Sequence, residues 1–459
     1  MKKSRILVSL ALVAFMVLMS IIPAFAAGDD EIIVNLSSTQ QIEGTESDPA
    51  QGAITKLLQM PHGTNVPQTT FKFTVTPISV DGDNDSTVTA AMPEIGTLGE
   101  VEIEFPPVGT PPAYTFKEID KNGIDYYYLE SSELFASVSW PHAGVYVYEI
   151  EELKTTFANK GTYPDAPYEI MTFSSAKYTV SVYVKDGNQG TYVFFVGAVK
   201  TTKEDGQPGT EKVDPTPGSE SNEFDYSQMI FINTYVKANG GTDPEDEDDW
   251  TLSISKVVSG DFASTSTYFK YDLKIITPSL LADPNASYKG YVVEKDATGA
   301  FTIVTSTANG ANALDNFILF GNGTAGTFYL KHGQYLVFTD TPVGTSYEIT
   351  EFGTSGYTPS VIVTYDSVAD AEEKGLKGAA LILPDANNTT YDYTLYVGET
   401  KNSADFTNKN ETETPTGLDL NDLPFIGMII LAIGGFITFI AFKARKRKAT
   451  LKNAAANCN

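Results

Sequence analysis

The run Tyr178-Thr179-Val180-Ser181-Val182-Tyr183-Val184 decides the fold class of this chain of 459 residues. Apolar residues recur at every second position, which gives an extended strand one apolar face and one more polar face. Similar runs, bounded by Gly, Asn, Asp and Pro, occur at 70–75, 145–150, 191–196, 252–258, 268–276, 335–338, 360–365 and 391–397. No long helical periodicity occurs before residue 423. The pattern predicts an all-β protein made of tandem Ig-like antiparallel β-sandwiches.

The strand-like runs fall into two groups, which we interpret as two domains. We expect the first β-sandwich at 50–237 and the second at 250–410, each with enough apolar and aromatic residues for a core. The acidic segment 238–249, which includes Gly240-Gly241 and six acidic residues, is typical of a linker. Inside the first domain, residues 201–222 are rich in Lys, Glu, Pro and Gly, and we expect a loop there. Residues 27–49 form a polar lead-in.

The first residues of the chain resemble a secretory signal peptide rather than part of a folded domain. Lys2, Lys3 and Arg5 precede the apolar run Ile6–Ile22, and Ala24-Phe25-Ala26 then supplies small residues at the spacing used for cleavage. We therefore expect residues 1–26 to be removed during export. The exported part then has no cysteine, because the single cysteine is Cys458. Disulfides cannot reinforce it, and any covalent reinforcement must use other chemistry.

The last part of the chain has the order expected of a sorting signal over 411–448. Glu413-Thr414-Pro415-Thr416-Gly417 comes first, and an uncharged run of 20 residues follows at 423–442. Such a run is long enough to cross a hydrocarbon core of roughly 30 Å as a transmembrane helix. The basic cluster at 443–448 would stay on the cytoplasmic side with the tail 449–459. An ordinary C-terminal membrane anchor is the alternative, and the Pro-Thr-Gly motif favours the sorting signal.

The charge of the chain limits the classes of partner it can bind. The formal net charge is −27, and most of the basic clusters lie in the two ends that export and sorting would remove. An exported body this acidic is not expected to bind nucleic acid or anionic lipid. The three histidines, His62, His142 and His332, have no spacing typical of a metal site. We expect no cofactor and no metal, and we expect that the protein is not an enzyme.

A short signature occurs once in each expected domain. The first domain has Tyr146-Val-Tyr148-Glu-Ile-Glu-Glu152, and the second has Tyr347-Glu-Ile-Thr-Glu351. Each signature follows a lysine by nearly the same distance. Each domain then ends with Phe-x-Asn. The lysine and asparagine pairs are Lys56 with Asn233 and Lys256 with Asn408.

Strand parity places these polar residues on the faces that the apolar residues mark as inward. Residues i and i+2 share a face of a strand. Lys256 therefore points the same way as Ile254, and Asn233 the same way as Phe231. Burial of a charged lysine is costly unless the lysine is paired or neutralised. The alternative, which parity leaves open, is that Lys56 and Lys256 lie at strand ends and reach water.

The chemistry that fits a buried lysine, glutamate and asparagine is a self-formed isopeptide bond. Burial favours the neutral lysine, whose amine is a nucleophile toward the carboxamide carbon of asparagine. Glu152 and Glu351 would assist as protonated groups that polarise the carboxamide and relay protons, so that ammonia leaves. Each domain would react once with itself, without turnover.

These segments together resemble the streptococcal-type pilin subunits of Gram-positive bacteria that carry the pilin isopeptide linkage domain. The shared features are an early lysine, a Tyr-x-Tyr-x-x-x-Glu strand and a terminal Phe-x-Asn, followed by a Glu-x-Pro-Thr-Gly sorting motif. The resemblance implies two intramolecular cross-links, Lys56–Asn233 and Lys256–Asn408. It also implies that a sortase cuts between Thr416 and Gly417 and passes Thr416 to another pilin subunit or to the cell-wall peptidoglycan. The protein would be membrane-anchored before this cleavage and then attached to the cell surface.

The sequence differs from these pilins at the position of the acceptor lysine. In the related pilins this lysine lies shortly before the final Phe-x-Asn of the first domain, and here Tyr226 occupies the aligned position. The candidate acceptors are the preceding lysines Lys200, Lys203 and Lys212. A backbone-type pilus subunit needs such a lysine. The alternative is a wall- or membrane-anchored adhesin or pilus-base protein that binds a host or matrix ligand and does not polymerise.

Overall fold

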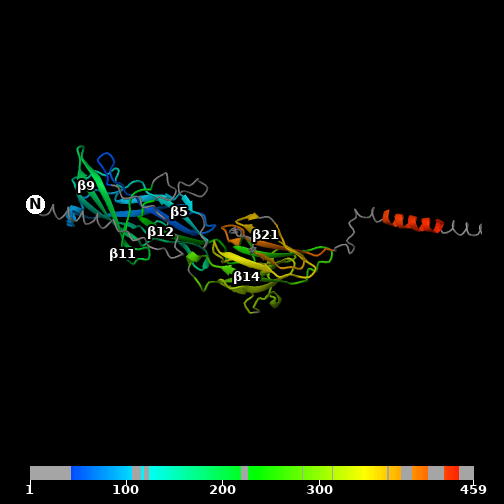
Figure 1. The fold of residues 1–459 in the computed structure, drawn as a ribbon. Coiled ribbons are helices and arrows are strands. Elements are labelled where there is room, and N and C mark those ends of the chain that lie inside the picture. Colours follow the sequence, from blue (N-terminus) through cyan, green and yellow to red (C-terminus); the bar gives the residue numbers. More distant parts are fainter. Residues whose placement is uncertain are drawn as a thin grey trace, which may run out of the picture.

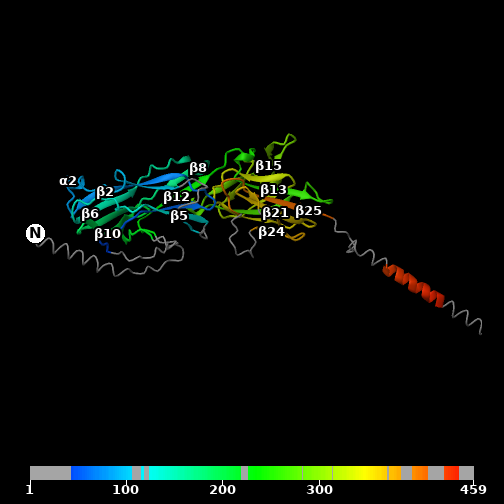
Figure 2. The same cartoon turned by 90° about the horizontal axis from the view of Figure 1, so that it is seen from above.

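The computed structural model describes residues 43–105, 115–117, 123–218, 226–281, 283–312, 314–369, 372–383, 395–411 and 428–443. In this part of the chain, strands β1 to β12 form one pair of sheets and strands β13 to β25 form another. The two pairs of sheets lie end to end along an elongated molecule (Figures 1 and 2). The predicted all-β fold is therefore confirmed.

The first pair of sheets is a sandwich of two six-stranded sheets in the described residues. One sheet has the order β4-β5-β1-β12-β8-β7, and the other has the order β11-β10-β9-β6-β2-β3. The bounds of the strands are β1 Thr55–Pro61, β2 Thr69–Val80, β3 Glu100–Phe105, β4 Thr115–Lys117, β5 Ile124–Glu130, β6 Gly144–Glu152, β7 Lys160–Thr162, β8 Asp165–Thr172, β9 Lys177–Asp186, β10 Thr191–Thr202, β11 Pro208–Val213 and β12 Ile230–Ala238. A one-turn helix, α2 (Ser86–Thr89), follows β2.

The second pair of sheets follows a short 3-10 turn, η1 (Glu247–Asp249). Its larger sheet has the order β16-β15-β19-β13-β25-β21-β22, with β17 on β15 and β23 on β21, and its smaller sheet has the order β18-β14-β20-β24. The bounds are β13 Leu252–Ser259, β14 Phe269–Ile276, β15 Ser287–Lys295, β16 Phe301–Ile303, β17 Ile318–Gly321, β18 Gly326–Leu330, β19 Gln334–Phe338, β20 Ser346–Glu351, β21 Thr358–Tyr365, β22 Val368–Ala369, β23 Glu373–Lys374, β24 Leu381–Leu383 and β25 Ser403–Lys409. Two further 3-10 turns are η2 (Ser279–Leu281) and η3 (Thr307–Asn309).

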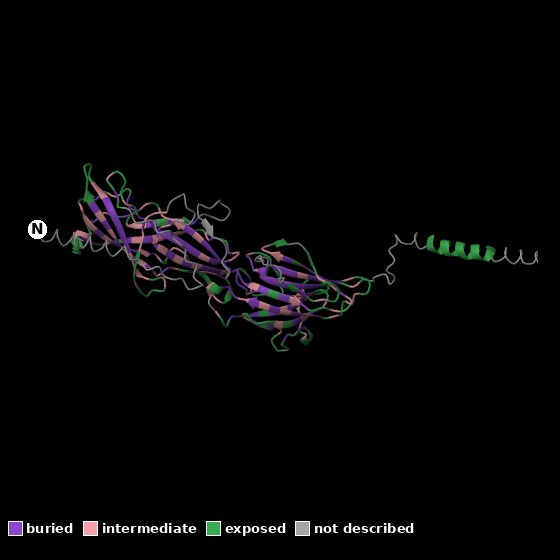
Figure 3. Ribbon diagram, in the orientation of Figure 1, coloured by how far each residue is buried: buried purple, intermediate pink, exposed green. Residues whose placement is uncertain are grey.

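Period-2 alternation produces the core of each sandwich. In β9, Tyr178, Val180, Val182 and Val184 are buried while the residues between them are half-buried, as the opening sequence run predicts. Figure 3 shows buried and less buried residues alternating along the strands of both sandwiches. Because each sheet buries one face against its partner sheet, each sandwich has its own apolar core.

Each sandwich joins its first and last strands directly, and this pairing is parallel. Strand β1 pairs with β12 and strand β13 pairs with β25, whereas the other pairings are antiparallel. The expected Ig-like antiparallel pattern therefore holds apart from one strand pair in each sandwich. Parallel neighbours need a long connection, and here that connection is the rest of the domain. The two ends of each domain thus lie side by side in one sheet.

The predicted loop 201–222 is wrong for part of its length, because β11 (Pro208–Val213) pairs with β10 there. An edge strand with both faces open to water needs no apolar alternation, so its charged sequence resembles that of a loop. Residues 43–50 run beside β10, where the Gly44 N–H donates to the Phe194 carbonyl.

The predicted signal peptide, the sortase site at Thr416 and Gly417, and the tail 449–459 lie outside the described residues. The described residues 428–443 are helical. Within the described residues, no helix is long and apolar enough to cross a membrane.

The junction between the two sandwiches is held by polar contacts as well as by the chain. Lys237 at the end of β12 lies 2.8 Å from the carboxylate of Glu399, which also accepts a hydrogen bond from the Asn65 N–H. Tyr163 donates through its hydroxyl to Asp283, at 2.9 Å. These contacts join the turn after β1 and the β7–β8 turn of the first domain to loops of the second domain. The junction is therefore packed rather than a bare tether.

Candidate functional site

The parallel strand pair brings the lysine and asparagine of the first domain together. Lys56 on β1 faces Phe231 on β12, and Asn233 lies one inward position further along β12, opposite Leu58. Glu152 is the last residue of β6 and faces Phe73 on β2, in the other sheet. The three side chains therefore come from both sheets and meet inside the sandwich.

The three side chains of the first domain are buried and in contact. Lys56 has 0% of its surface exposed, and Glu152 and Asn233 are also buried. The Lys56 Nζ lies 2.8 Å from Glu152 Oε1, and Asn233 Nδ2 donates a hydrogen bond of 2.8 Å to the same oxygen. One carboxylate oxygen thus bridges the lysine nitrogen and the carboxamide nitrogen.

The second domain repeats this arrangement with the same register. Lys256 on β13 faces Phe406 on β25, and Asn408 faces Val258. Glu351, the last residue of β20, accepts from Lys256 Nζ at 2.7 Å and from Asn408 Nδ2 at 2.7 Å, both through Oε1. All three residues are buried, with Lys256 only 1% exposed. The alternative interpretation, in which the two lysines reach water, is therefore wrong in both domains.

Aromatic rings complete each site. Lys56 Nζ lies 4.6 Å from the centre of the Phe71 ring, and Lys256 Nζ lies 4.2 Å from the centre of the Phe269 ring. The next inward residues, Phe73 and Tyr271, contact the phenylalanine of the Phe-x-Asn motif. The apolar rings exclude water, which strengthens every electrostatic interaction inside.

Burial changes the protonation of the lysines. Burial lowers the pKa of Lys56 to about 8, although the nearby Glu152 carboxylate opposes this change. Burial likewise lowers the pKa of Lys256 to about 8 against the effect of Glu351. The pKa of Glu351 is raised, because its own burial outweighs the stabilising lysine. Both shifts favour the neutral amine and the neutral acid, which are the forms needed for attack and proton transfer.

The two sites differ at the carboxamide oxygen. In the first domain, Asn233 Oδ1 accepts a hydrogen bond of 2.8 Å from the backbone N–H of Ser174, in the turn between β8 and β9. In the second domain, Asn408 Oδ1 is buried and has no hydrogen-bond partner among the described residues. The glutamate contacts the carboxamide in both domains, and it does so at the nitrogen rather than at the oxygen.

The candidate acceptor lysines lie on the β10–β11 hairpin. Lys200 is mostly covered and forms an ion pair with Glu204 at 3.7 Å, whereas Lys203 is exposed and pairs with Glu211 at 3.7 Å. Lys212 on β11 is exposed and faces Val199. Tyr226, at the position aligned with the pilin acceptor, stacks on Tyr128 with ring centres 5.3 Å apart.

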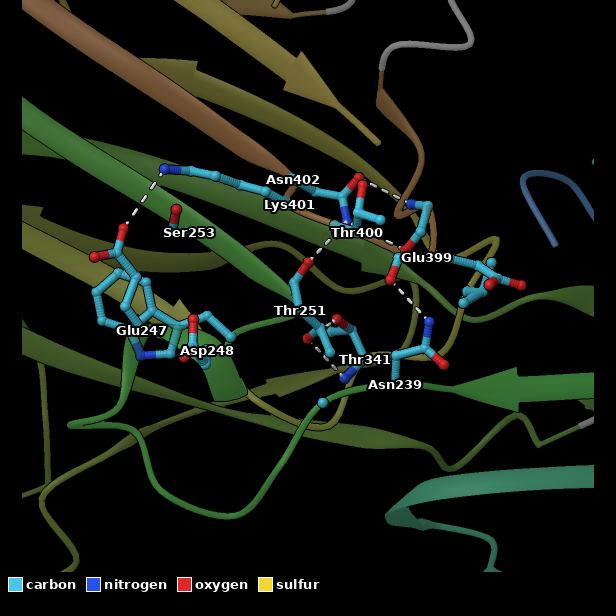
Figure 4. A pocket seen from close by; sticks show the side chains of 14 residues that line it. Asn239, Glu247, Asp248, Thr251, Ser253, Thr341, Glu399, Thr400, Lys401 and Asn402 are labelled. Carbon is cyan, nitrogen blue, oxygen red and sulfur yellow. Dashed lines mark hydrogen bonds and ion pairs between the residues drawn. The ribbon is translucent and has the colours of Figure 1, made fainter. Parts of the chain in front are cut away.

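A cavity of about 280 Å³ lies where the linker meets the second domain (Figure 4). Its polar groups largely bond one another. Asn402 donates to the Thr251 and Thr400 carbonyls, and the Asn239 side chain donates to the Glu399 carbonyl. Within the described residues, no group of three or more His, Cys, Asp or Glu side chains is placed to hold a metal ion.

Sequence reasoning missed several residues of the two sites. The rings were accessible in principle, because Phe71-Lys-Phe73 and Phe269-Lys-Tyr271 repeat an aromatic-Lys-aromatic pattern after each lysine strand. Ser174 and Glu204 had no such signal. They lie in the connections between strands, where no periodic pattern marks a residue.

Two domain-family models match the chain. Residues 53–236 match the family described as Spy0128-like isopeptide containing domain, and residues 250–410 match a domain of unknown function, DUF7601. Among curated proteins, the chain is 26% identical over 254 residues to a protein named Pilin from Streptococcus pyogenes serotype M1. This match covers 51% of the chain, and the chain spans 65% of the length of that relative.

Solved pilus proteins are also similar to the chain. The major pilin of Streptococcus pyogenes matches with 16% identity and a TM-score of 0.29, over 80% of this chain and 100% of that one. A pilus-presented adhesin matches with 14% identity and a TM-score of 0.22, over 52% of this chain and 37% of that one. The family match and the curated relative confirm the resemblance to Gram-positive pilins that the sequence motifs predict.

Proposed function

We infer, from the membership of residues 53–236 in the Spy0128-like isopeptide-containing domain family, that this chain is a Gram-positive pilus subunit. One observation carries the proposal, namely that a buried Lys–Glu–Asn triad occurs twice, in the same strand register and with one glutamate oxygen close to both nitrogens. Burying an ion pair has a large desolvation cost, and a covalent product would remove the charge of the lysine. The role is structural, without turnover.

In each domain the proposed reaction replaces the side-chain amide of asparagine with an amide to lysine. The neutral Nζ attacks the carboxamide carbon, forming the Nζ–Cγ bond. The Nζ proton passes to the glutamate Oε1, which lies within 2.8 Å of both nitrogens in each domain, and then to Nδ2. The Cγ–Nδ2 bond breaks and ammonia leaves. The products are one isopeptide bond and one ammonia per domain.

The position of these bonds suits a protein that carries tension. Lys56–Asn233 and Lys256–Asn408 each join the first strand of a domain to its last strand, which are already neighbours in the sheet. Force that enters by one terminal strand leaves by the other through the bond, so the domain need not unfold. A chain whose exported part has no cysteine cannot obtain this reinforcement from disulfides.

Assembly would use the ends of the chain. A signal peptide at 1–26 exports the protein, and the membrane holds it by the span 423–442 until a sortase cuts between Thr416 and Gly417. Thr416 then passes to a lysine of another pilin subunit or to cell-wall peptidoglycan, which places the protein on the cell surface. Among the candidate acceptors we favour the exposed Lys203 and Lys212 over Lys200, which is mostly covered.

Intact-mass measurement tests the cross-links. The purified chain is expected to be lighter than its sequence by one ammonia, roughly 17 Da, for each domain. Lys56→Ala and Lys256→Ala should each restore one ammonia. Lys237→Ala is the matched control, because Lys237 also pairs with a glutamate at 2.8 Å but is 16% exposed and has no buried asparagine. A wild-type mass equal to that of the plain sequence contradicts the proposal.

The alternative is an adhesin or pilus-base protein, and the observation in its favour is Tyr226 at the aligned acceptor position. Denaturing gels of cell-wall extracts separate the two functions. A pilus subunit gives a ladder of high-mass species that disappears without sortase. A protein that is anchored but does not polymerise gives one species.

A further inference from the structure

The carboxamide of Asn233 is held at its oxygen as well as at its nitrogen. The backbone N–H of Ser174 donates to Asn233 Oδ1 at 2.8 Å, and both residues are buried. A backbone N–H can only donate, so it fixes the carboxamide with its oxygen toward Ser174 and its nitrogen toward Glu152. This orientation aims Nδ2, the leaving group, at the proton relay.

The course of β8 explains why a free N–H is available there. The last residue of β8, Thr172, faces Thr234, so β8 ends just before it reaches Asn233. The chain then turns at 173–176 and enters β9 in the other sheet. The turn brings the Ser174 N–H to the carboxamide instead of to a ladder hydrogen bond.

Glu204, from the β10–β11 turn, holds this turn in place. The hydroxyl of Ser174 donates to Glu204 Oε2, and the Ile232 N–H on β12 donates to the same oxygen at 3.4 Å. The Ser174 hydroxyl also accepts from the Ala176 N–H at 3.0 Å. Glu204 thus ties the turn to the strand that carries Asn233, where β8 no longer pairs.

Among the described residues of the second domain, no equivalent donor reaches the carboxamide oxygen. Its corresponding neighbour strand, β21, continues along β25 and places Pro359 opposite Asn408. Proline has no backbone N–H, and Asn408 Oδ1 has no hydrogen-bond partner in the described part of the chain. The two sites share the lysine, the glutamate and the asparagine but differ in what faces the carboxamide oxygen.

We propose that the Ser174 backbone N–H is the oxyanion donor of the first cross-linking reaction, positioned by Glu204. The inference rests on the proposed function. When Lys56 Nζ attacks Cγ, the carbonyl electron pair moves to Oδ1, and the Ser174 N–H stabilises that negative charge. The pair returns to form the carbonyl as the Cγ–Nδ2 bond breaks, and ammonia leaves with the proton relayed by Glu152. Such donors, fixed before reaction in a water-excluded site, stabilise transition states strongly.

The test removes this single N–H. The full chain is made by cell-free translation with the α-hydroxy acid analogue of serine at position 174, so that an ester oxygen replaces the N–H and the side chain is kept. Mass spectrometry of peptides follows the cross-linked fraction of each domain over time. The Lys256–Asn408 reaction in the same molecules is the internal control.

We expect the Lys56–Asn233 reaction to slow by about 100-fold, the usual effect of losing one oxyanion donor, with the second reaction unchanged. Equal first-domain rates with and without the N–H overturn the inference while leaving the cross-links in place. If neither domain of the wild-type chain loses ammonia, the proposed function fails, and this inference fails with it.

If the ester variant is not resistant to protease and so has not folded, a second pair of variants tests the role of Ser174 and Glu204. Glu204→Gln keeps an oxygen that can accept from Ser174 and Ile232, and it should retain the wild-type rate. Glu204→Ala removes the acceptor and should slow only the first-domain reaction, by about tenfold. Equal rates for the two variants, at equal folded fraction, contradict the positioning role.

Discussion

The stability that the proposed Lys56–Asn233 cross-link would supply can be measured with the variant Asn233→Ala. The substitution removes the carbon that Lys56 attacks and leaves the Lys56–Glu152 pair, at 2.8 Å, in its buried place. The bond closes a loop that runs from β1 to β12, which is nearly the whole domain. By the chain-entropy account used for disulfides, closing a loop of more than one hundred residues lowers the free energy of folding by about 5 kcal/mol.

This free energy corresponds to a large shift in melting temperature. For a domain of this size, 1 kcal/mol changes the Tm by roughly 2 to 4 °C, so Asn233→Ala should lower the first-domain Tm by about 10 to 20 °C. Differential scanning calorimetry of residues 27–416 measures the shift, and intact mass verifies that one ammonia is retained. Asn408→Ala is the matched control and should lower the other transition. A first-domain shift below about 3 °C in a variant without the bond would refute the estimate.

Four further predictions concern the same sites. Glu351→Ala removes the proton relay of the second domain, so the chain should lose one ammonia instead of two by intact mass, and a loss of two contradicts the role of Glu351. The second-domain reaction should speed up as the pH rises toward 8, because burial lowers the pKa of Lys256 to about 8 and the neutral amine is the attacking form; a rate that falls as the pH approaches 8 would oppose this. In the Asn408→Ala variant Lys256 stays uncoupled, and its pKa is about 8 in the folded chain against 10.5 in the unfolded chain. Between pH 8 and pH 10.5 the unfolded chain therefore binds more protons than the folded chain. The free energy of unfolding, measured by urea titration, should rise with pH over this range. Single-molecule pulling on residues 43 and 411 should give no domain-sized extension of about 600 Å, while Asn233→Ala should restore one.

The strands and the inward lysines could be predicted from the sequence because both depend on the period of two. Any residue two positions from a buried Ile or Phe on a strand is inward too, and this places Lys56 and Asn233 without knowledge of the partner strands. The duplication of the signature then favoured a shared role for the polar residues. The order of strands was not needed for that step.

The sequence could not predict contacts that depend on how strands pair. The period of two predicts on which face of the sheet Lys56 lies, but it does not predict that β12 is the parallel neighbour of β1. The register between these two strands sets the distance from Lys56 to Asn233. Ser174 and Glu204 come from turns, where backbone geometry rather than side-chain pattern decides what meets Asn233. Strand β11 was missed because an edge strand open to water keeps a charged sequence.

If both proposed cross-links form, the junction between the domains is the part of the folded chain that tension can lengthen. Force passes from Lys56 to Asn233, along residues 234–255, and then from Lys256 to Asn408, so each domain is bypassed. Full extension of 234–255 adds at most about 70 Å. The contacts that resist this are noncovalent, and the Lys237–Glu399 pair is the most enclosed ion pair among them, with 16% and 10% of the side chains exposed. Because water screens it little, the pair resists separation more than a surface ion pair does. We therefore expect the mechanical compliance of the folded chain to concentrate in the acidic linker.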